Sequence, residues 1–155
     1  MTATTGTDAL ITTEMVDLNL QATSKDDATR HLAELLVGQG RITDLDGFLA
    51  DVRAREAQMP TGLEGGIGIP HCRSEHVTVP TVGFGKSDAG VDYGAADGPA
   101  HLIFLIAAPA GADSDHLKIL AALARRLVRQ QFKDTLRAAT DPAAVADYIR
   151  TEVTP

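Results

Sequence analysis

Apolar residues recur at helical spacing in two segments near the start of the chain. The first segment is expected to form a helix from Ser24 until Gly38 and Gly40 stop it, because Ser24 is a good N-cap residue and Asp27 follows three positions later, as in a capping box. The second helix is expected to start at Thr43 or Asp44 and to end between Arg55 and Gln58, before Pro60. Both helices precede the strongly apolar part of the chain.

Apolar runs in the middle of the chain predict strands, and helical patterns follow them. The last of these runs is nearly continuous, which is typical of a central strand buried on both faces. The order of elements favours an α/β or α+β fold with a mixed sheet. The strand segments are 9–20 (in short pieces), 66–69, 77–84 and 102–108, and the C-terminal helices are 115–130 and 142–149.

The length of the chain predicts one domain with a sizeable core, because it has 155 residues. We expect residues 1–8 to form a disordered lead-in, residues 9–150 the folded domain, and residues 151–155 a tail or the start of a linker. The first residues lack the basic and apolar regions of a secretory signal. The longest uncharged apolar run, residues 102–111, is too short to span a bilayer.

Charge and cysteine content narrow the classes of partner and compartment. The formal net charge is −7 and no basic stripe is present, which argues against nucleic-acid binding. The same charge suits a partner with a basic docking face. Cys72 is the only cysteine, which excludes an internal disulfide and fits a reducing cytosol. We therefore expect a cytoplasmic protein that does not insert into a membrane.

The segment Gly-Gly-Ile-Gly-Ile-Pro-His-Cys-Arg, residues 65–73, carries the main chemical signal. Pro70 has no N–H to offer a sheet and restricts the residue before it to extended geometry. A strand is therefore expected to end at Ile69, with His71 on the turn that follows. A histidine with an ordinary pKa of about 6.5 is largely neutral in the cytosol and can act as a nucleophile. On this local pattern alone, a nucleophilic role and an ordinary loop position are equally open for His71.

A second histidine, His116, follows three consecutive capping residues, Asp-Ser-Asp, and so falls in the first turn of a helix. Free N–H groups and the positive end of the helix dipole favour anions there, although most histidines in first turns are simply solvated. Strand ends and helix N-termini gather on one edge of an α/β sheet. His71 and His116 can therefore meet on that edge.

His71, Cys72 and His76 also suggest two other kinds of site, a metal site and a thiol nucleophile. A metal site of His71, Cys72 and His76 matches no common zinc spacing. A thiol nucleophile at Cys72 is disfavoured because neighbours in an extended segment point to opposite sides, so Cys72 is better explained as a small buried residue. His31, His76 and His101 are assigned to structure or surface.

Arg55 is the third candidate, at the end of the second expected helix, where an arginine also suits the helix dipole without any further role. Arg-Glu at 55–56, a threonine–glycine stretch, Gly-Ile-Gly-Ile-Pro-His at 66–71 and Asp-His-Leu-Lys-Ile-Leu at 115–120 together resemble one known family. This is the enzyme IIA domain of the fructose–mannitol family of the phosphoenolpyruvate-dependent sugar phosphotransferase system. The resemblance covers about residues 10–149 and is greatest to fructose-type members, although Gly68 stands where alanine is common.

The resemblance implies a fold and a set of roles. The fold would be α/β, a single compact domain with a mixed central sheet of about five strands flanked by helices. His71 would be the phosphorylated nucleophile, Arg55, sixteen positions earlier, would compensate the charge of the phosphoryl group, and His116 would stabilise it. No metal or cofactor is implied.

The resemblance also implies partners. The carrier protein HPr would donate the phosphoryl group, and a cysteine of an enzyme IIB domain would accept it for fructose uptake. The IIB domain would be a separate chain or fused with IIC in a larger polypeptide. Some members of the family serve nitrogen regulation and share the core motif. A regulatory module whose phosphorylation state controls partner proteins is therefore the alternative.

Overall fold

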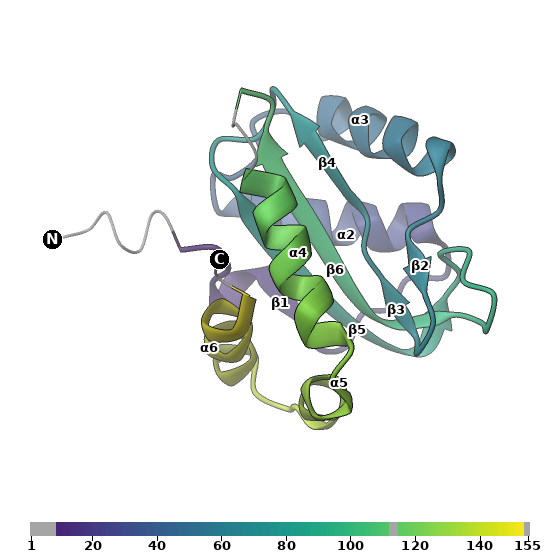
Figure 1. Ribbon diagram of the computed structural model, residues 1–155. Helices are drawn as coiled ribbons and strands as arrows, with labels where there is room; N and C mark the ends of the chain where they lie inside the picture. Colours follow the sequence, from purple (N-terminus) through teal and green to yellow (C-terminus); the bar gives the residue numbers. More distant parts are fainter. Residues whose placement is uncertain (1–8, 112–114, 154–155) are drawn as a thin grey trace, which may run out of the picture.

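A mixed β-sheet runs through the centre of the molecule, and helices lie on both of its faces (Figure 1). The computed structural model describes residues 9–111 and 115–153, without the side chains of Asp115 and His116. The elements are η1 (Thr13–Met15), β1 (Val16–Asp17), α2 (Lys25–Gly38), α3 (Leu45–Gln58), β2 (Gly62–Leu63), β3 (Ile67–Gly68), β4 (His71–Ser74), β5 (Thr81–Val91), β6 (Ala100–Pro109), α4 (Asp115–Leu127), α5 (Gln130–Ala138) and α6 (Pro142–Val153).

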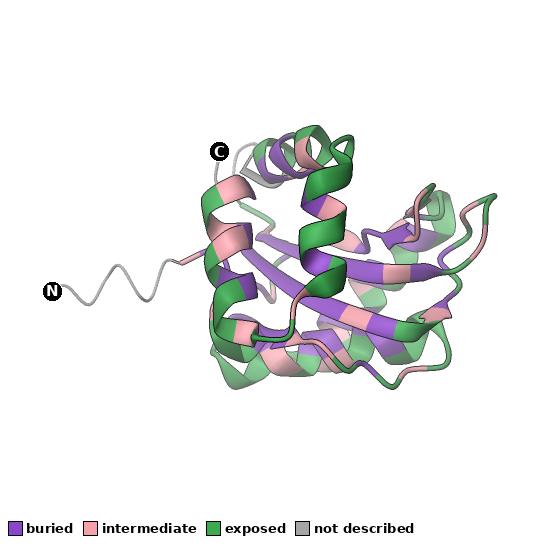
Figure 2. Cartoon of the chain, turned by 90° about the horizontal axis from the view of Figure 1, so that it is seen from below, coloured by how far each residue is buried: buried purple, intermediate pink, exposed green. Residues whose placement is uncertain are grey.

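The sheet has the strand order β1-β5-β6-β3-β2, and β4 also pairs with β6. The β5–β6 and β2–β3 pairs are antiparallel, whereas β1–β5, β3–β6 and β4–β6 are parallel. This confirms the expected mixed sheet, with six strands in the described part of the chain. In β6, every residue from Leu102 to Ala108 is buried, as its continuous apolar sequence predicts for a central strand (Figure 2).

The two N-terminal helices begin and end close to the predicted residues. The Ser24 hydroxyl accepts the N–H of Asp27 at 3.1 Å, and the Asp44 carboxylate accepts the N–H of Gly47 at 3.2 Å. Each side chain therefore satisfies one of the free N–H groups of a first helical turn. Helices α2 and α3 lie on one face of the sheet, and α4, α5 and α6 lie on the other (Figure 1).

The helix expected over residues 115–130 ends three residues early, and a further helix that the sequence pattern did not predict follows it. Helix α4 ends at Leu127, Val128 is 82% exposed, and α5 begins at Gln130. The turn between them allows Phe132 to enter the core, where its ring centroid lies 5.5 Å from that of Tyr148. Packing of this aromatic residue therefore overrides the helical pattern that continues through residue 130. The helical spacing of the apolar residues predicts one face that consists of Leu117, Leu120, Leu123, Ala124, Leu127 and Val128. The buried side of α4 instead consists of Ile119, Ala122, Leu123 and Leu127, whereas Leu117 and Ala124 are exposed.

The last helix is longer than predicted. Helix α6 continues to Val153, whose side chain is fully buried, so residues 151–153 belong to the folded domain and not to a tail. Within the described residues, no helix combines the length and the apolar character needed to cross a membrane.

Gly68 in β3 leaves room for a buried tyrosine. A Cβ atom on Gly68 would lie 2.8 Å from Cδ2 of Tyr93, closer than such atoms approach in proteins. The Tyr93 ring is 1% exposed, and its hydroxyl forms a hydrogen bond of 2.9 Å with Thr29 Oγ1 of α2. The Tyr93 ring is therefore held by its buried position and by the hydrogen bond of its hydroxyl group, and it has little freedom to move away from Gly68.

We expect Gly68→Ala to lower the free energy of unfolding by about 1–3 kcal/mol, because the added methyl group overpacks this contact. Urea denaturation measures the effect. Gly38→Ala is the matched control, since a Cβ there meets nothing within 4 Å, and it should leave stability unchanged or slightly raised. An equal free energy of unfolding for the Gly68→Ala variant and the native chain would contradict this expectation, because it would show that the Tyr93 ring can move aside without loss of stability.

Candidate functional site

His71 is the first residue of β4, not part of a turn, which corrects the expectation from the sequence. Ile67 is aligned with Leu102 of β6 and His71 with Ile106, so β3 and β4 keep one register on either side of Pro70. Pro70 cannot donate a hydrogen bond, but its carbonyl accepts the N–H of Ile106 at 3.0 Å. The strand therefore resumes directly after the proline and holds His71 on a rigid element.

The imidazole of His71 is fixed by a hydrogen bond to the backbone two residues earlier. Its Nδ1 lies 2.8 Å from the carbonyl oxygen of Ile69. A carbonyl oxygen only accepts hydrogen bonds, so Nδ1 carries the proton of the neutral ring. The lone pair of the neutral ring is therefore on Nε2, which is the nitrogen available as a nucleophile.

The surroundings of His71 favour its neutral form. Burial lowers the pKa of His71 below its ordinary value of 6.5, and the positive charge of Arg55 lowers it further. The hydrogen bond to the Ile69 carbonyl and the negative charge of Glu56 act in the opposite direction, but the net shift is downward. The ring is therefore neutral at the pH of the cytosol.

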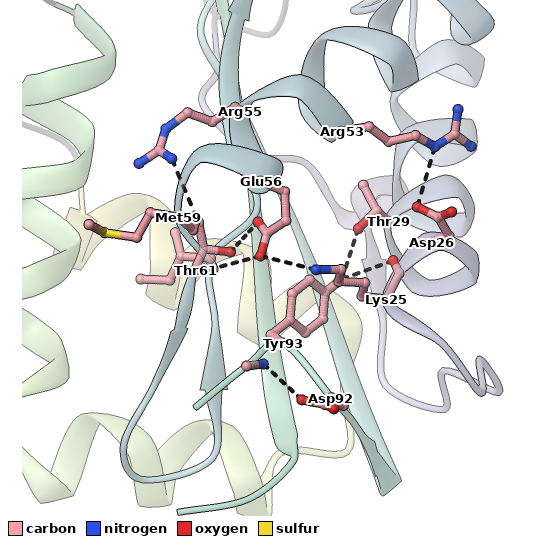
Figure 3. A network of polar contacts seen from close by, with 12 residues as sticks. Lys25, Asp26, Thr29, Arg53, Arg55, Glu56, Met59, Thr61, Asp92 and Tyr93 are labelled. Atoms are coloured by element: carbon pink, nitrogen blue, oxygen red, sulfur yellow. Dashed lines mark hydrogen bonds and ion pairs between the residues drawn. The ribbon is translucent and has the colours of Figure 1, made fainter. Parts of the chain in front are cut away.

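Arg55 and His71 line the same cleft, as the sequence predicts for two residues of one site. The cleft has a volume of about 490 Å³ and is formed by residues of α3, β4 and α4. Arg55 lies in the last turn of α3, and its Nη1 is 3.5 Å from the carbonyl oxygen of Met59 (Figure 3). This contact is long, so most donors of the guanidinium remain available for an anion in the cleft.

His116 lies in the first turn of α4, as expected, but its side chain is outside the described residues. Its neighbour Leu117 lines the cleft together with Leu120. The start of α4 therefore borders the cleft that contains His71. Asp113 and Ser114 of the predicted cap also lie outside the described residues.

Cys72 is buried, in agreement with its interpretation as a small packing residue. Burial, together with the charge of Asp51, raises the pKa of its thiol to about 12. At neutral pH the side chain is therefore a thiol and not the nucleophilic thiolate.

The other described histidines make contacts away from the cleft. His31 Nε2 lies 2.7 Å from a carboxylate oxygen of Asp17, and His101 Nδ1 lies 2.8 Å from the carbonyl oxygen of Ser87. His76 lies beside acidic side chains in the segment after β4. Among residues 9–111 and 117–153, no three His, Cys, Asp or Glu side chains are arranged to hold a metal ion.

Glu56 and Thr61, which have no role in the predicted site, are joined by hydrogen bonds next to Arg55. Both residues are buried, and Glu56 is the immediate neighbour of Arg55. The Glu56 carboxylate accepts the N–H and the hydroxyl of Thr61 (Figure 3). In the sequence, Arg-Glu and the threonine–glycine stretch belong to the family resemblance, but an acidic residue next to a helix-terminal arginine is explained equally well by a solvated helix end.

Residues 9–152 match the model of the family described as "Phosphoenolpyruvate-dependent sugar phosphotransferase system, EIIA 2". The chain is 38% identical to the fructose-specific EIIA component of Haloferax volcanii over 88% of this chain and 89% of that protein. It is 36% identical to the fructose-specific EIIABC component of Bacillus subtilis over 90% of this chain, but this match covers only 22% of that larger protein.

A solved structure has a fold similar to that of this chain. Nitrogen regulatory protein IIA-Ntr from Neisseria meningitidis superposes with a TM-score of 0.82 at 26% identity, over 90% of this chain and 96% of that one. The family match covers nearly all of the described domain, including α3, β4 and α4, which form the cleft. The chain therefore belongs to the EIIA 2 family of the phosphoenolpyruvate-dependent sugar phosphotransferase system.

Proposed function

We propose that this chain is a phosphoryl carrier that accepts a phosphoryl group from phospho-HPr on His71 and passes it to a cysteine of an enzyme IIB domain for fructose uptake. The observation that carries the proposal is the neutral His71 ring, with Nε2 free and Arg55 in the same cleft. The fructose-specific names of the relatives from Haloferax volcanii and Bacillus subtilis support the choice of sugar. The EIIABC name of the second relative supports a IIB partner that is fused with IIC in a larger polypeptide.

In the first step, the lone pair on Nε2 of His71 attacks the phosphorus atom carried by the donor histidine. The new nitrogen–phosphorus bond forms as the donor's bond breaks, and the donor ring keeps the electron pair. Positive charge develops on the His71 ring, and the Ile69 carbonyl, which accepts the Nδ1 proton, stabilises it. In the second step, the phosphoryl group leaves Nε2 for the thiolate of the IIB cysteine.

Arg55 and His116 stabilise the phosphoryl group in this proposal. The guanidinium of Arg55 supplies a fixed positive charge and several donors for the phosphoryl oxygens. His116 donates a hydrogen bond to one of those oxygens, from the helix terminus that borders the cleft. Phosphoryl transfer depends mainly on positioning and charge compensation, which is what these residues would provide.

Transfer to purified IIB domains tests the proposed function. The phosphorylated chain, made with phosphoenolpyruvate, enzyme I and HPr, is mixed with fructose-specific and mannitol-specific IIB domains in separate reactions. Rapid transfer to the fructose-specific domain is expected. Efficient transfer only to the mannitol domain would contradict the choice of sugar, and transfer to neither would contradict the role in uptake.

The regulatory function is the second candidate. It is supported by the name of the Neisseria protein, a nitrogen regulatory protein with a similar fold. In that case the phosphorylated and unphosphorylated chains would bind a target protein with different affinities, and phosphoryl transfer to IIB would be slow. The same IIB assay separates the two functions. Labelling of His71 by phospho-HPr without onward transfer is the result expected of a regulatory protein.

The lowered pKa of His71 predicts how its ring titrates. Since protonation begins only when the pH approaches the pKa, the NMR titration of His71 should have its midpoint below 6.5. Nε2 therefore stays nucleophilic as the pH falls through the range in which an unperturbed histidine becomes charged. A histidine model peptide titrated in parallel is the control. A midpoint at or above that of the peptide would contradict the burial of the ring.

A further inference from the structure

A continuous path of hydrogen bonds connects the buried carboxylate of Glu56 to the imidazole of His71. The carboxylate accepts the Thr61 N–H at 2.8 Å and the Thr61 hydroxyl at 2.7 Å. The Thr61 carbonyl in turn accepts the N–H of Ile69 at 3.1 Å. The carbonyl of Ile69 accepts the Nδ1 proton of His71 at 2.8 Å.

The same carboxylate is linked to Arg55 through the backbone. Arg55 precedes Glu56 in the last turn of α3, and its guanidinium contacts the carbonyl of Met59. Because Glu56 holds Thr61, it fixes the three-residue connection between α3 and β2, residues 59–61, and this connection includes Met59 (Figure 3). The positions of His71 and Arg55 therefore both depend on the hydrogen bonds that the Glu56 carboxylate makes.

We call the hydrogen-bonded pair of Glu56 and Thr61 the clamp. It is a buried polar contact with a partly balanced charge. Glu56 is 7% exposed and Thr61 is 8% exposed, so water competes little for either group. The charge of Glu56 is partly balanced by Lys25, whose Nζ lies 3.8 Å from the carboxylate. Burying a carboxylate is costly unless hydrogen bonds and a counter-charge compensate it, and both are present here.

We propose that Glu56, acting through Thr61, is a positioning residue that sets the geometry of both His71 and Arg55 for phosphoryl transfer. The inference rests on the proposed function, because positioning matters only if His71 accepts a phosphoryl group. Glu56 itself touches neither the phosphoryl group nor the partner protein. Its loss should therefore lower kcat for phosphorylation by phospho-HPr and leave KM for phospho-HPr close to the native value.

Variants of Thr61 test the inference with the least disturbance. Thr61→Val removes only the hydroxyl donor and should lower kcat about ten- to a hundredfold, the range seen when outer residues that orient a reactive group are removed. Thr61→Ser keeps the hydroxyl and should restore kcat. Glu56→Gln keeps an acceptor for the Thr61 N–H, but its amide N–H₂ makes the second contact a weaker neutral bond in which the Thr61 hydroxyl accepts, so it should act in the same direction as Thr61→Val and more weakly.

Thr81→Val is the matched control. The Thr81 hydroxyl is also buried, accepts from Arg41 Nη1 at 3.0 Å and donates to the carbonyl of Val79 at 2.9 Å, but it is not connected to His71 by these bonds. We expect it to lower the melting temperature without lowering kcat at a temperature where the variant is folded. A native kcat in folded Thr61→Val, or a loss of kcat in Thr61→Ser equal to that in Thr61→Val, would overturn the positioning role.

Nitrogen NMR of the His71 ring gives a second readout that needs no phosphoryl donor. In the native chain it should show a single tautomer with the proton on Nδ1, and in Thr61→Val and Glu56→Gln a mixture of both tautomers. If the native chain is not labelled by phospho-HPr but these tautomer changes occur, the proposed function fails while the clamp stands. If labelling occurs and neither kcat nor the tautomer changes, only the clamp is wrong.

Discussion

Replacing His71 with alanine should abolish phosphorylation of the chain by phosphoenolpyruvate, enzyme I and HPr. No other described histidine presents a free ring nitrogen to the cleft, so no side chain among these can substitute for Nε2. The fold should be unaffected, because the ring is partly exposed and its hydrogen bond is made to the backbone two residues earlier. Mass spectrometry measures the phosphoryl group, and circular dichroism measures the fold.

His76→Ala is the control for this experiment, since His76 lies just after the same strand but outside the cleft. It should be labelled to the same extent as the native chain. Stoichiometric labelling of folded His71→Ala would contradict the assignment, and a loss of labelling in both variants would point to a general effect on the strand.

Replacing Arg55 with alanine should slow phosphoryl transfer about ten- to a hundredfold. Removing one hydrogen bond to a charged group costs about 1.5–3 kcal/mol, which corresponds to that change in rate. Stability should change by about 0.5 kcal/mol or less, because Arg55 is partly exposed at a helix end. Stopped-flow transfer from phospho-HPr and thermal unfolding measure the two effects, and His116→Ala should show the same pattern.

Arg53 offers a matched control on the same helix. It points away from Arg55, toward α2, and its Nε lies 3.3 Å from Asp26 Oδ1 (Figure 3). Arg53→Ala removes the same net charge without reaching the cleft, so its transfer rate should stay near the native value. If both variants slow transfer equally, the overall charge of the surface matters and not the position of Arg55.

The parts of the fold that follow from local chemistry could be predicted from the sequence. The continuous apolar run 102–108 is the buried central strand, because a strand covered on both faces has no polar side. The caps at Ser24 and Asp44 place two helix starts, since the side-chain oxygens satisfy free N–H groups wherever the rest of the chain lies.

The parts that depend on distant contacts could not be predicted. Helix α4 ends at Leu127 because Phe132 packs against Tyr148 and Phe104, and no local sequence pattern indicates these contacts. Val153 is fully buried, and its helix α6 packs on η1 and β1, which precede it by more than a hundred residues. The continuation of the strand through Pro70 likewise depends on a hydrogen bond supplied by Ile106 of β6.

The residues of the candidate site also differ in whether they could be predicted from the sequence. His71 and Arg55 could be identified because a strand interrupted by proline and a helix end are visible in the sequence, and a family resemblance assigns them roles. Glu56 could not be identified, because its importance comes from its burial and from the two donors of Thr61. Neither feature differs, at the level of sequence, from an ordinary charged helix terminus.

The central claim is that the phosphoryl group is carried by Nε2 of His71. Nitrogen NMR of the phosphorylated chain, with labelled histidine, tests it directly because coupling to phosphorus identifies the bonded ring nitrogen. We predict one phosphorylated histidine, His71, bonded through Nε2, with Nδ1 still carrying its proton toward the Ile69 carbonyl. Phosphorus bonded to Nδ1 of His71, or to any other residue, would contradict the account.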